Sequence, residues 1–360
     1  MDIKRYEIAG LANRPAWWRV RVNEIESFCG AIKNGKCTVE ARTPWDLPVF
    51  QVVYNDYPDS SNIVNWMSVV STRTPDLFGN KEGSPQTVMI SGGIHGAEIE
   101  GVILVLNLIS LLETGVDLRG KPNDRLVELA KKYRLVLFPC VNMDGRAVSP
   151  DHRIGASIEE CRRAGEGFWT NGNVIRWPEM KEYFPLPLER VAHTGGYCNS
   201  EGYNIMHDGT PGNVRTQEAL AVLRAAEKYK VDLYVNLHSQ PETPYNGFRM
   251  HSMCSFPYSI KVVEELSIRC KKVLEERGFV YEPEAVRPPA CKLDINTPVH
   301  LCSGAATATI EFAARDPENF DTIVETGYAF LETILASGDD MLFCDRKNWK
   351  TLNAQLMKNS

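Results

Sequence analysis

The stretch "TVMISGGIHGAEIEGV" (residues 87–102) decides the interpretation of this chain. The apolar run "TVMI" is typical of a buried strand, and the two glycines after it let the backbone turn sharply. A helix is expected over 98–113, so His95 and Glu98 lie three residues apart at its start. At that spacing both side chains can face the same way. The stretch therefore indicates either half of a metal site or a helix start stabilised by a first-turn acid.

The same alternation of short apolar runs and amphipathic segments continues along the chain. Strands are expected in 134–142, 231–239 and 307–313, and helices in 215–230, 259–278 and 318–336. Alternating strands and helices favour an α/β layer fold with a parallel or mixed sheet. Residues 143–204 lack periodicity and are rich in Gly, Pro, Trp, Arg and Asn, which favours a functional region over a simple connection.

Composition excludes several classes of protein. The chain has 360 residues, 43% of them hydrophobic, and a net charge of −6. Without a dense basic block, nucleic acid and anionic membranes are poor partners. No signal-peptide pattern or membrane-length apolar run is found, so a cytoplasmic location is expected. The ten cysteines form no CxxC pair, which favours free thiols over disulfides or a cysteine-based zinc site.

Three ionisable residues are expected at strand ends, where α/β proteins bind ligands. His95 follows "TVMI", His238 ends "VDLYVNL", and Glu311 ends "TATI". Zinc in hydrolytic sites takes three His or carboxylate ligands and leaves one position open. We therefore predict one Zn²⁺ held by His95, Glu98 and His238. Glu311, whose burial in an apolar strand requires a partner or a function, is the candidate proton acceptor.

These motifs together resemble the zinc carboxypeptidases, the M14 metallopeptidases, whose relatives include succinylglutamate desuccinylase and aspartoacylase. "GGIHGAEIEG" resembles the family's HxxE element, and "FPCVNMDGR" (138–146) its P-x-x-N-P-D-G segment with Met143 in place of proline. "LHS" (237–239) resembles the late-histidine element, and "ATIEFA" (308–313) the strand of the general-base glutamate. "ARTPWDLPVFQVVY" (41–54) resembles the entry strand, and the order agrees over about 42–335.

The resemblance implies a three-layer α/β/α sandwich around a mixed sheet of roughly eight strands. It also implies the zinc ligands and the Glu311 role given above, and an arginine that stabilises the oxyanion. The domain prediction is an N-terminal extension (1–40) packed on a catalytic domain (41–340), followed by a tail (341–360). A peptide or a small N-acyl compound is the expected substrate. Whether the protein forms a homo-oligomer stays open.

The departures from the family concern substrate recognition. "GYNIMHD" (202–208) stands where the family has G-V-D-L-N-R, so Asn204 replaces the aspartate that braces the first zinc histidine. Met206 and His207 replace the Asn-Arg pair that grips a terminal carboxylate. His207 then becomes the candidate substrate contact, and plain carboxypeptidase activity is in doubt.

The remaining site residues are open between alternatives. Arg176 and Arg190 are both candidates for the oxyanion arginine, with Arg176 favoured by the neighbouring Trp177. Asn204, Arg146 and His300 are further candidates for substrate contacts. The function expected is a zinc-dependent amide hydrolase, a carboxypeptidase-like metallopeptidase with altered recognition of the substrate carboxylate. The alternatives are a small-molecule N-acyl deacylase, an endopeptidase or cell-wall-peptide trimming enzyme, and a catalytically silent binding protein.

Overall fold

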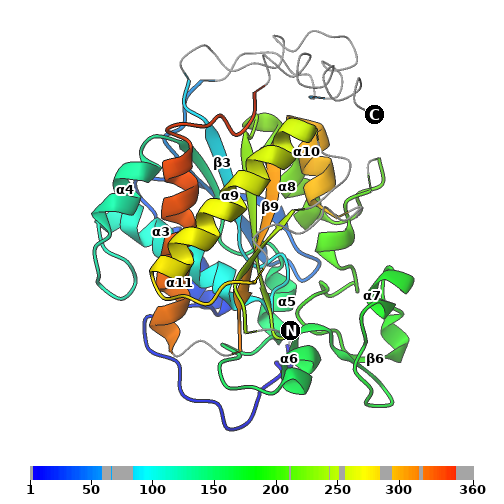
Figure 1. Cartoon of the computed structure of the whole chain (residues 1–360). Coiled ribbons are helices and arrows are strands. Elements are labelled where there is room, and N and C mark those ends of the chain that lie inside the picture. Colours follow the sequence, from blue (N-terminus) through cyan, green and yellow to red (C-terminus); the bar gives the residue numbers. More distant parts are fainter. Residues whose placement is uncertain are drawn as a thin grey trace.

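A computed structural model describes residues 3–58, 66, 84–210, 212–242, 244–250, 256–283, 294–315 and 319–345. Its central sheet has seven strands in the order β1-β2-β4-β3-β7-β9-β8 (Figure 1). The strands are β1 (Lys36–Arg42), β2 (Pro48–Tyr54), β3 (Thr87–Ser91), β4 (Arg134–Phe138), β7 (Leu233–Gln240), β8 (Gly247–Met250) and β9 (Ala306–Ala313).

The four central strands β4, β3, β7 and β9 run parallel, and the outer strands pair antiparallel. The sheet is therefore mixed, as expected, although within the described residues it has seven strands instead of roughly eight. Parallel neighbours bring their carboxyl ends to one edge of the sheet, and the candidate site lies there.

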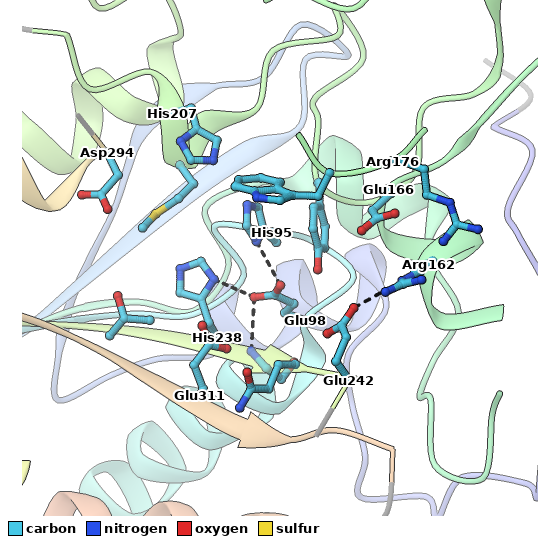
Figure 2. Close-up of a pocket in the computed structure, with 16 residues that line it drawn as sticks. His95, Glu98, Arg162, Glu166, Arg176, His207, His238, Glu242, Asp294 and Glu311 are labelled. Atoms are coloured by element: carbon cyan, nitrogen blue, oxygen red, sulfur yellow. Dashed lines mark hydrogen bonds and ion pairs between the residues drawn. The ribbon is translucent and has the colours of Figure 1, made fainter. Parts of the chain in front are cut away.

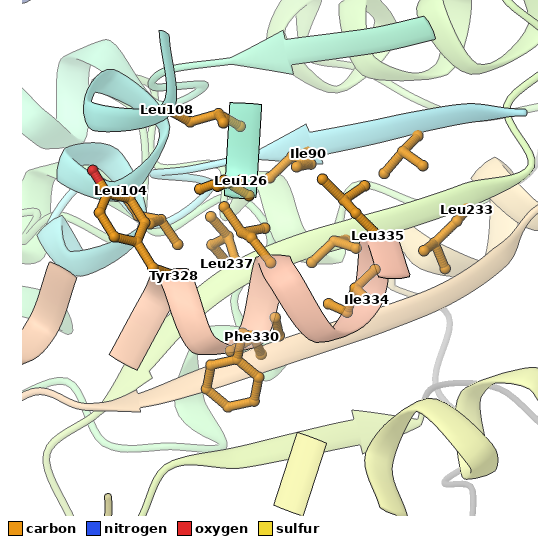
Figure 3. Close-up of a cluster of buried hydrophobic side chains, with 14 of the residues drawn as sticks. Ile90, Leu104, Leu108, Leu126, Leu233, Leu237, Tyr328, Phe330, Ile334 and Leu335 are labelled. Carbon is orange, nitrogen blue, oxygen red and sulfur yellow. The ribbon is translucent and has the colours of Figure 1, made fainter. Parts of the chain in front are cut away.

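Helices cover both faces of the sheet. On one face lie α3 (Ile99–Thr114), α4 (Asp124–Ala130), α9 (Pro257–Glu276) and α11 (Phe320–Ser337), and on the other α8 (Gln217–Lys228) and α10 (Asn296–Ser303). Side chains alternate along β3: Val88 and Ile90 join the first layer's core, and Met89 joins the second. Figure 3 shows α11 residues such as Tyr328 and Ile334 packed against the sheet. The predicted three-layer α/β/α architecture is confirmed.

The region without periodicity folds into short elements. They are α5 (Met143–Val148), α6 (Ile158–Gly165), β5 (Phe168–Trp169), α7 (Glu179–Glu182), β6 (Val191–His193) and two 3₁₀ turns, Leu188–Arg190 and Ile205–His207. β5 and β6 form a separate two-stranded sheet, and Trp169, Ile175 and Met180 belong to a small core of their own. This region lies beside the main sheet (Figure 1).

The N-terminal segment packs on the main body through α1 (Val22–Gly30) and the residues before it. Trp18 is fully buried in a cluster with Ile99 and Val102 of α3. β1 begins at Lys36, inside the predicted extension, and residues 346–360 of the predicted tail lie outside the described residues. The domain division stays a prediction. No helix in the described ranges is long and apolar enough to cross a membrane.

Candidate metal centre and active site

The loop after β3 rests directly on the segment after β4. Backbone amides of Val141 and Asn142 donate to the carbonyls of Gly92 and Gly93, at 3.1 and 2.8 Å. A Cβ on Gly96 would lie 2.1 Å from the backbone nitrogen of Arg146. Only glycine permits this approach. The "GGIHGAE" and "FPCVNMDGR" motifs, about 40 residues apart in sequence, therefore form one platform.

His95 is held in place on three sides. Its Nδ1 lies 3.0 Å from Glu98 Oε1, and its Nε2 lies 3.1 Å from Asn204 Oδ1. Its ring stacks on Tyr197, with centroids 4.0 Å apart and planes at 12°. Because the Asn204 oxygen accepts the Nε2 proton, the Nδ1 lone pair is directed toward Glu98 and the space beside it. Asn204 thus occupies the bracing place that the sequence suggested.

Glu98 joins the two histidines. It precedes α3 in a non-helical conformation, so the pair lies in a tight turn and not within the first helical turn. Its Oε2 lies 2.7 Å from His238 Nδ1 and accepts the backbone N–H of Ser239 at 3.2 Å. Burial alone would raise the pKa of Glu98, but the two imidazoles outweigh it and hold the pKa well below its usual value.

Glu311 stands next to this cluster on the neighbouring strand. β7 and β9 pair in parallel with His238 opposite Glu311, so both side chains leave the same face of the sheet. Each is the sixth residue of a strand that continues for two more residues, so neither ends its strand as the sequence suggested. Burial raises the pKa of Glu311 to about 7, with His238 opposing and Glu98 adding to the shift.

The three donors fit a zinc ion. One ligand atom from each of His95, Glu98 and His238 lies within 4.8 Å of the others, and all three side chains are buried. Two imidazole nitrogens and a carboxylate are a catalytic zinc donor set that leaves a fourth position open. The hydrogen bond from His95 to Asn204 is the outer support that such ligands require. Figure 2 shows the three side chains converging, with Glu311 beneath His238.

A cavity of about 530 Å³ opens over these residues. Beyond the four just described, its lining includes Arg162, Glu166, Arg176, Trp177, Tyr197, Met206, His207, Ser239, Gln240, Glu242, Asp294 and Thr309. Of the two oxyanion candidates, Arg176 lines it. His207 lines it as well, with its ring 5.1 Å from that of Trp177.

Arg190, Arg146 and His300 are not in this lining. The Arg190 guanidinium lies over the rings of Trp169 and Tyr183. Arg146 is buried and donates to the carbonyls of Gly96, Ser149 and Pro150. His300 is buried between the backbone N–H of Phe256 and the carbonyl of Ala305. The three residues therefore lie outside the cavity lining in this structure, and the roles suggested for them by the sequence stay predictions.

Three acids of the lining had no sequence signal: Glu166 follows α6, Glu242 follows β7, and Asp294 precedes α10. Arg162 belongs to α6. Figure 2 places Arg162, Glu166, Arg176 and Glu242 on one wall, opposite His207 and Asp294. Only the packing of the irregular region brings this wall to the metal centre, so periodicity and motif spacing could not identify it.

The geometry defines a protein with a candidate three-ligand metal centre at the edge of an α/β/α sheet. Residues 65–278 match the zinc carboxypeptidase family, which is more than half of the chain. The chain therefore belongs to that family, as its motifs predicted. A comparison with curated proteins found no match to this chain.

Solved structures share the fold at low identity. A metallo-carboxypeptidase from Burkholderia cenocepacia aligns with 17% identity and a TM-score of 0.58, over 88% of this chain and 69% of that chain. A metallo-carboxypeptidase from Pseudomonas aeruginosa, in complex with (2-guanidinoethylmercapto)succinic acid, aligns with 15% identity and a TM-score of 0.54, over 88% and 67%. These likenesses support the architecture described above.

Proposed function

We propose that this protein is a zinc-dependent hydrolase that cleaves an amide bond. The observation that carries the proposal is the convergence of His95, Glu98 and His238, with Glu311 in register beside His238. Zinc held there would polarise a carbonyl and increase the acidity of a water molecule. A buried carboxylate beside it is the group that such a reaction requires to accept a proton.

Other residues of the chain transfer the proton, stabilise the oxyanion and orient the ligands. Glu311 accepts the proton of the attacking water and returns it to the leaving amine. Arg176, the oxyanion candidate found in the lining, would leave Glu159 to donate hydrogen bonds to the developing oxyanion. Asn204 and Ser239 keep His95 and Glu98 in their orientations. Tyr197, stacked on His95, shields one side of the centre.

Recognition of the substrate differs from a plain carboxypeptidase. His207 stands at the place of the clamping arginine, and an imidazole cannot make the two parallel hydrogen bonds of a guanidinium. The described lining has no arginine on the His207 wall. This favours a second candidate, a deacylase of a small N-acyl compound, because a cavity of about 530 Å³ suits a small molecule.

The test is a screen of N-acyl amino acids and short peptides with wild type and Glu311→Gln. We expect the substitution to lower kcat by about 10²–10⁴-fold with the zinc content of the protein unchanged. Glu265→Gln removes a similar carboxylate from an exposed pair on α9 and is the control. Unchanged turnover in Glu311→Gln would refute the mechanism. A wild-type protein that neither retains zinc nor hydrolyses any compound would instead be a binding protein.

A further inference from the structure

Glu166 is a buried carboxylate on the cavity wall without a dedicated partner. It is 7% exposed, and its Oε2 has no hydrogen-bond partner in the described part of the chain. It lines the cavity over the metal centre. A buried carboxylate that accepts no compensating hydrogen bond is costly, so this oxygen indicates a missing donor.

The neighbouring cations are engaged elsewhere. Arg162 Nε donates to Glu242 Oε1 at 3.4 Å, and Arg176 Nη2 pairs with Glu159 Oε2 at 3.6 Å. Burial raises the pKa of Glu166 to about 7, although Arg162 and Arg176 lower it, while Glu242 and Glu159 raise it further. The two guanidiniums therefore do not neutralise Glu166 as a direct ion pair would.

The described lining as a whole has an excess of acid. It contains the carboxylates of Glu98, Glu166, Glu242, Asp294 and Glu311, and the guanidiniums of Arg162 and Arg176. A divalent ion at the metal centre would offset two of the three surplus negative charges. Glu98 and Glu311 belong to that centre. Around Glu166, the carboxylates of Glu166, Glu242 and Glu159 outnumber the guanidiniums of Arg162 and Arg176 by one, so a further cation would be attracted there.

We propose that Glu166, assisted by Glu242, binds a primary ammonium group of the substrate. This inference rests on the proposed hydrolase function and narrows its substrates to amides that carry a free amino group. An ammonium offers three donors and can satisfy the Oε2 of Glu166 while facing the cavity. A free α-amino terminus and a lysine-type side chain both offer this ammonium group, and matched peptides distinguish them.

The experiment uses matched peptides that differ in the amino group. Trialanine carries a free α-amino group, N-acetyl-trialanine carries none, and the third peptide replaces the first residue of the acetylated one with lysine. A charge-assisted hydrogen bond contributes about 1.5–3 kcal/mol. We therefore expect wild type to prefer one amino peptide over N-acetyl-trialanine by about 10–150-fold in kcat/KM, mainly through KM.

Glu166→Gln should abolish this preference, so that kcat/KM for the preferred amino peptide falls to about the value that the same variant shows for N-acetyl-trialanine. Glu182→Gln, at an exposed position of α7, is the matched control and should retain the preference. A second measurement, calorimetric binding of the three peptides to Glu311→Gln, is independent of turnover. It should show the same preference for an amino peptide. Adding Glu166→Gln to this variant should abolish that preference in binding affinity.

The outcomes separate the two proposals. The ammonium site would be overturned if wild type showed equal kcat/KM for N-acetyl-trialanine and both amino peptides. It would also be overturned if the preference survived Glu166→Gln. Hydrolysis of N-acetyl-trialanine in that case would leave the hydrolase proposal standing. If wild type cleaves nothing, the binding measurement still decides the ammonium site.

Discussion

Removing Glu100 should destabilise the protein by breaking a buried ion pair beneath the metal centre. Arg153 Nη2 lies 3.3 Å from Glu100 Oε2 and donates to Ser239 Oγ at 2.5 Å, and Ser239 Oγ donates to Glu100 Oε2 at 2.5 Å. Glu100 is 1% exposed and Arg153 0%. In Glu100→Ala the guanidinium stays buried without its counter-charge.

The expected loss is about 3–5 kcal/mol in the free energy of unfolding, the usual cost of removing one partner of a buried pair. Within the described residues, Arg153 makes no ion pair with an acid other than Glu100. Arg153 Nε and Nη1 are already buried without hydrogen-bond partners among the described residues. Glu100→Gln keeps an acceptor for Ser239 but loses the charge, so its loss should be smaller.

Urea unfolding followed by circular dichroism measures the loss. Zinc-free protein is used because bound metal would add stability by mass action. Glu128→Ala, which removes an exposed pair with Lys131, is the control and should lose at most ~1 kcal/mol. If Glu100→Ala lost no more free energy of unfolding than this control, the buried ion pair would not contribute to stability as described.

Three further predictions concern Asn204, which holds His95, the buried acid Glu218, and Trp18 in the N-terminal segment. Asn204→Ala should weaken zinc binding by about 10–100-fold, measured by competition with a chromophoric chelator, whereas Asn204→Asp should strengthen it by making His95 more basic. Burial raises the pKa of Glu218 to about 7, so the folded state holds a proton that the unfolded state loses near its ordinary pKa of 4.5. Stability of zinc-free protein should therefore fall as pH rises between these values, and Glu218→Gln should be more stable than wild type at pH 8 by up to ~3 kcal/mol; an unchanged pH profile would contradict this. Trp18→Ala should cost about 3–5 kcal/mol, because its side chain is fully buried against α3; a loss near zero in urea unfolding would show that this segment does not contribute to the core.

The convergence of His95, Glu98 and His238 could be predicted because local rules determine it. The expected helix over 98–113 is α3, Ile99–Thr114, and the apolar runs before His238 and Glu311 are parallel strands. Parallel strands with carboxyl ends at one edge must bring their late residues together. Motif order then sufficed to associate residues more than 200 positions apart, such as His95 and Glu311.

The substrate wall could not be predicted, because its residues come from a region shaped by close backbone packing. Gly167 has a positive φ of 79°, and a Cβ there would lie 2.2 Å from the carbonyl oxygen of His193. This contact joins the end of α6 to β6 and fixes where Glu166 lies. Likewise, aromatic rings hold Arg190 outside the cavity while Arg176 lines it. Neither outcome has a periodic or motif signal.

Glu100 illustrates a third kind of information, which neither motif nor periodicity contains. In the sequence it is one more acid in the first turn of a helix, where the helix dipole alone explains it. In the structure, one residue, Ser239, serves both acids: its backbone N–H holds Glu98 and its hydroxyl holds Glu100. The strand that carries His238 is thereby tied to the helix start that carries Glu98. The orientation of the candidate metal ligands thus depends on a pair of contacts that become visible only when α3 and β7 are placed side by side.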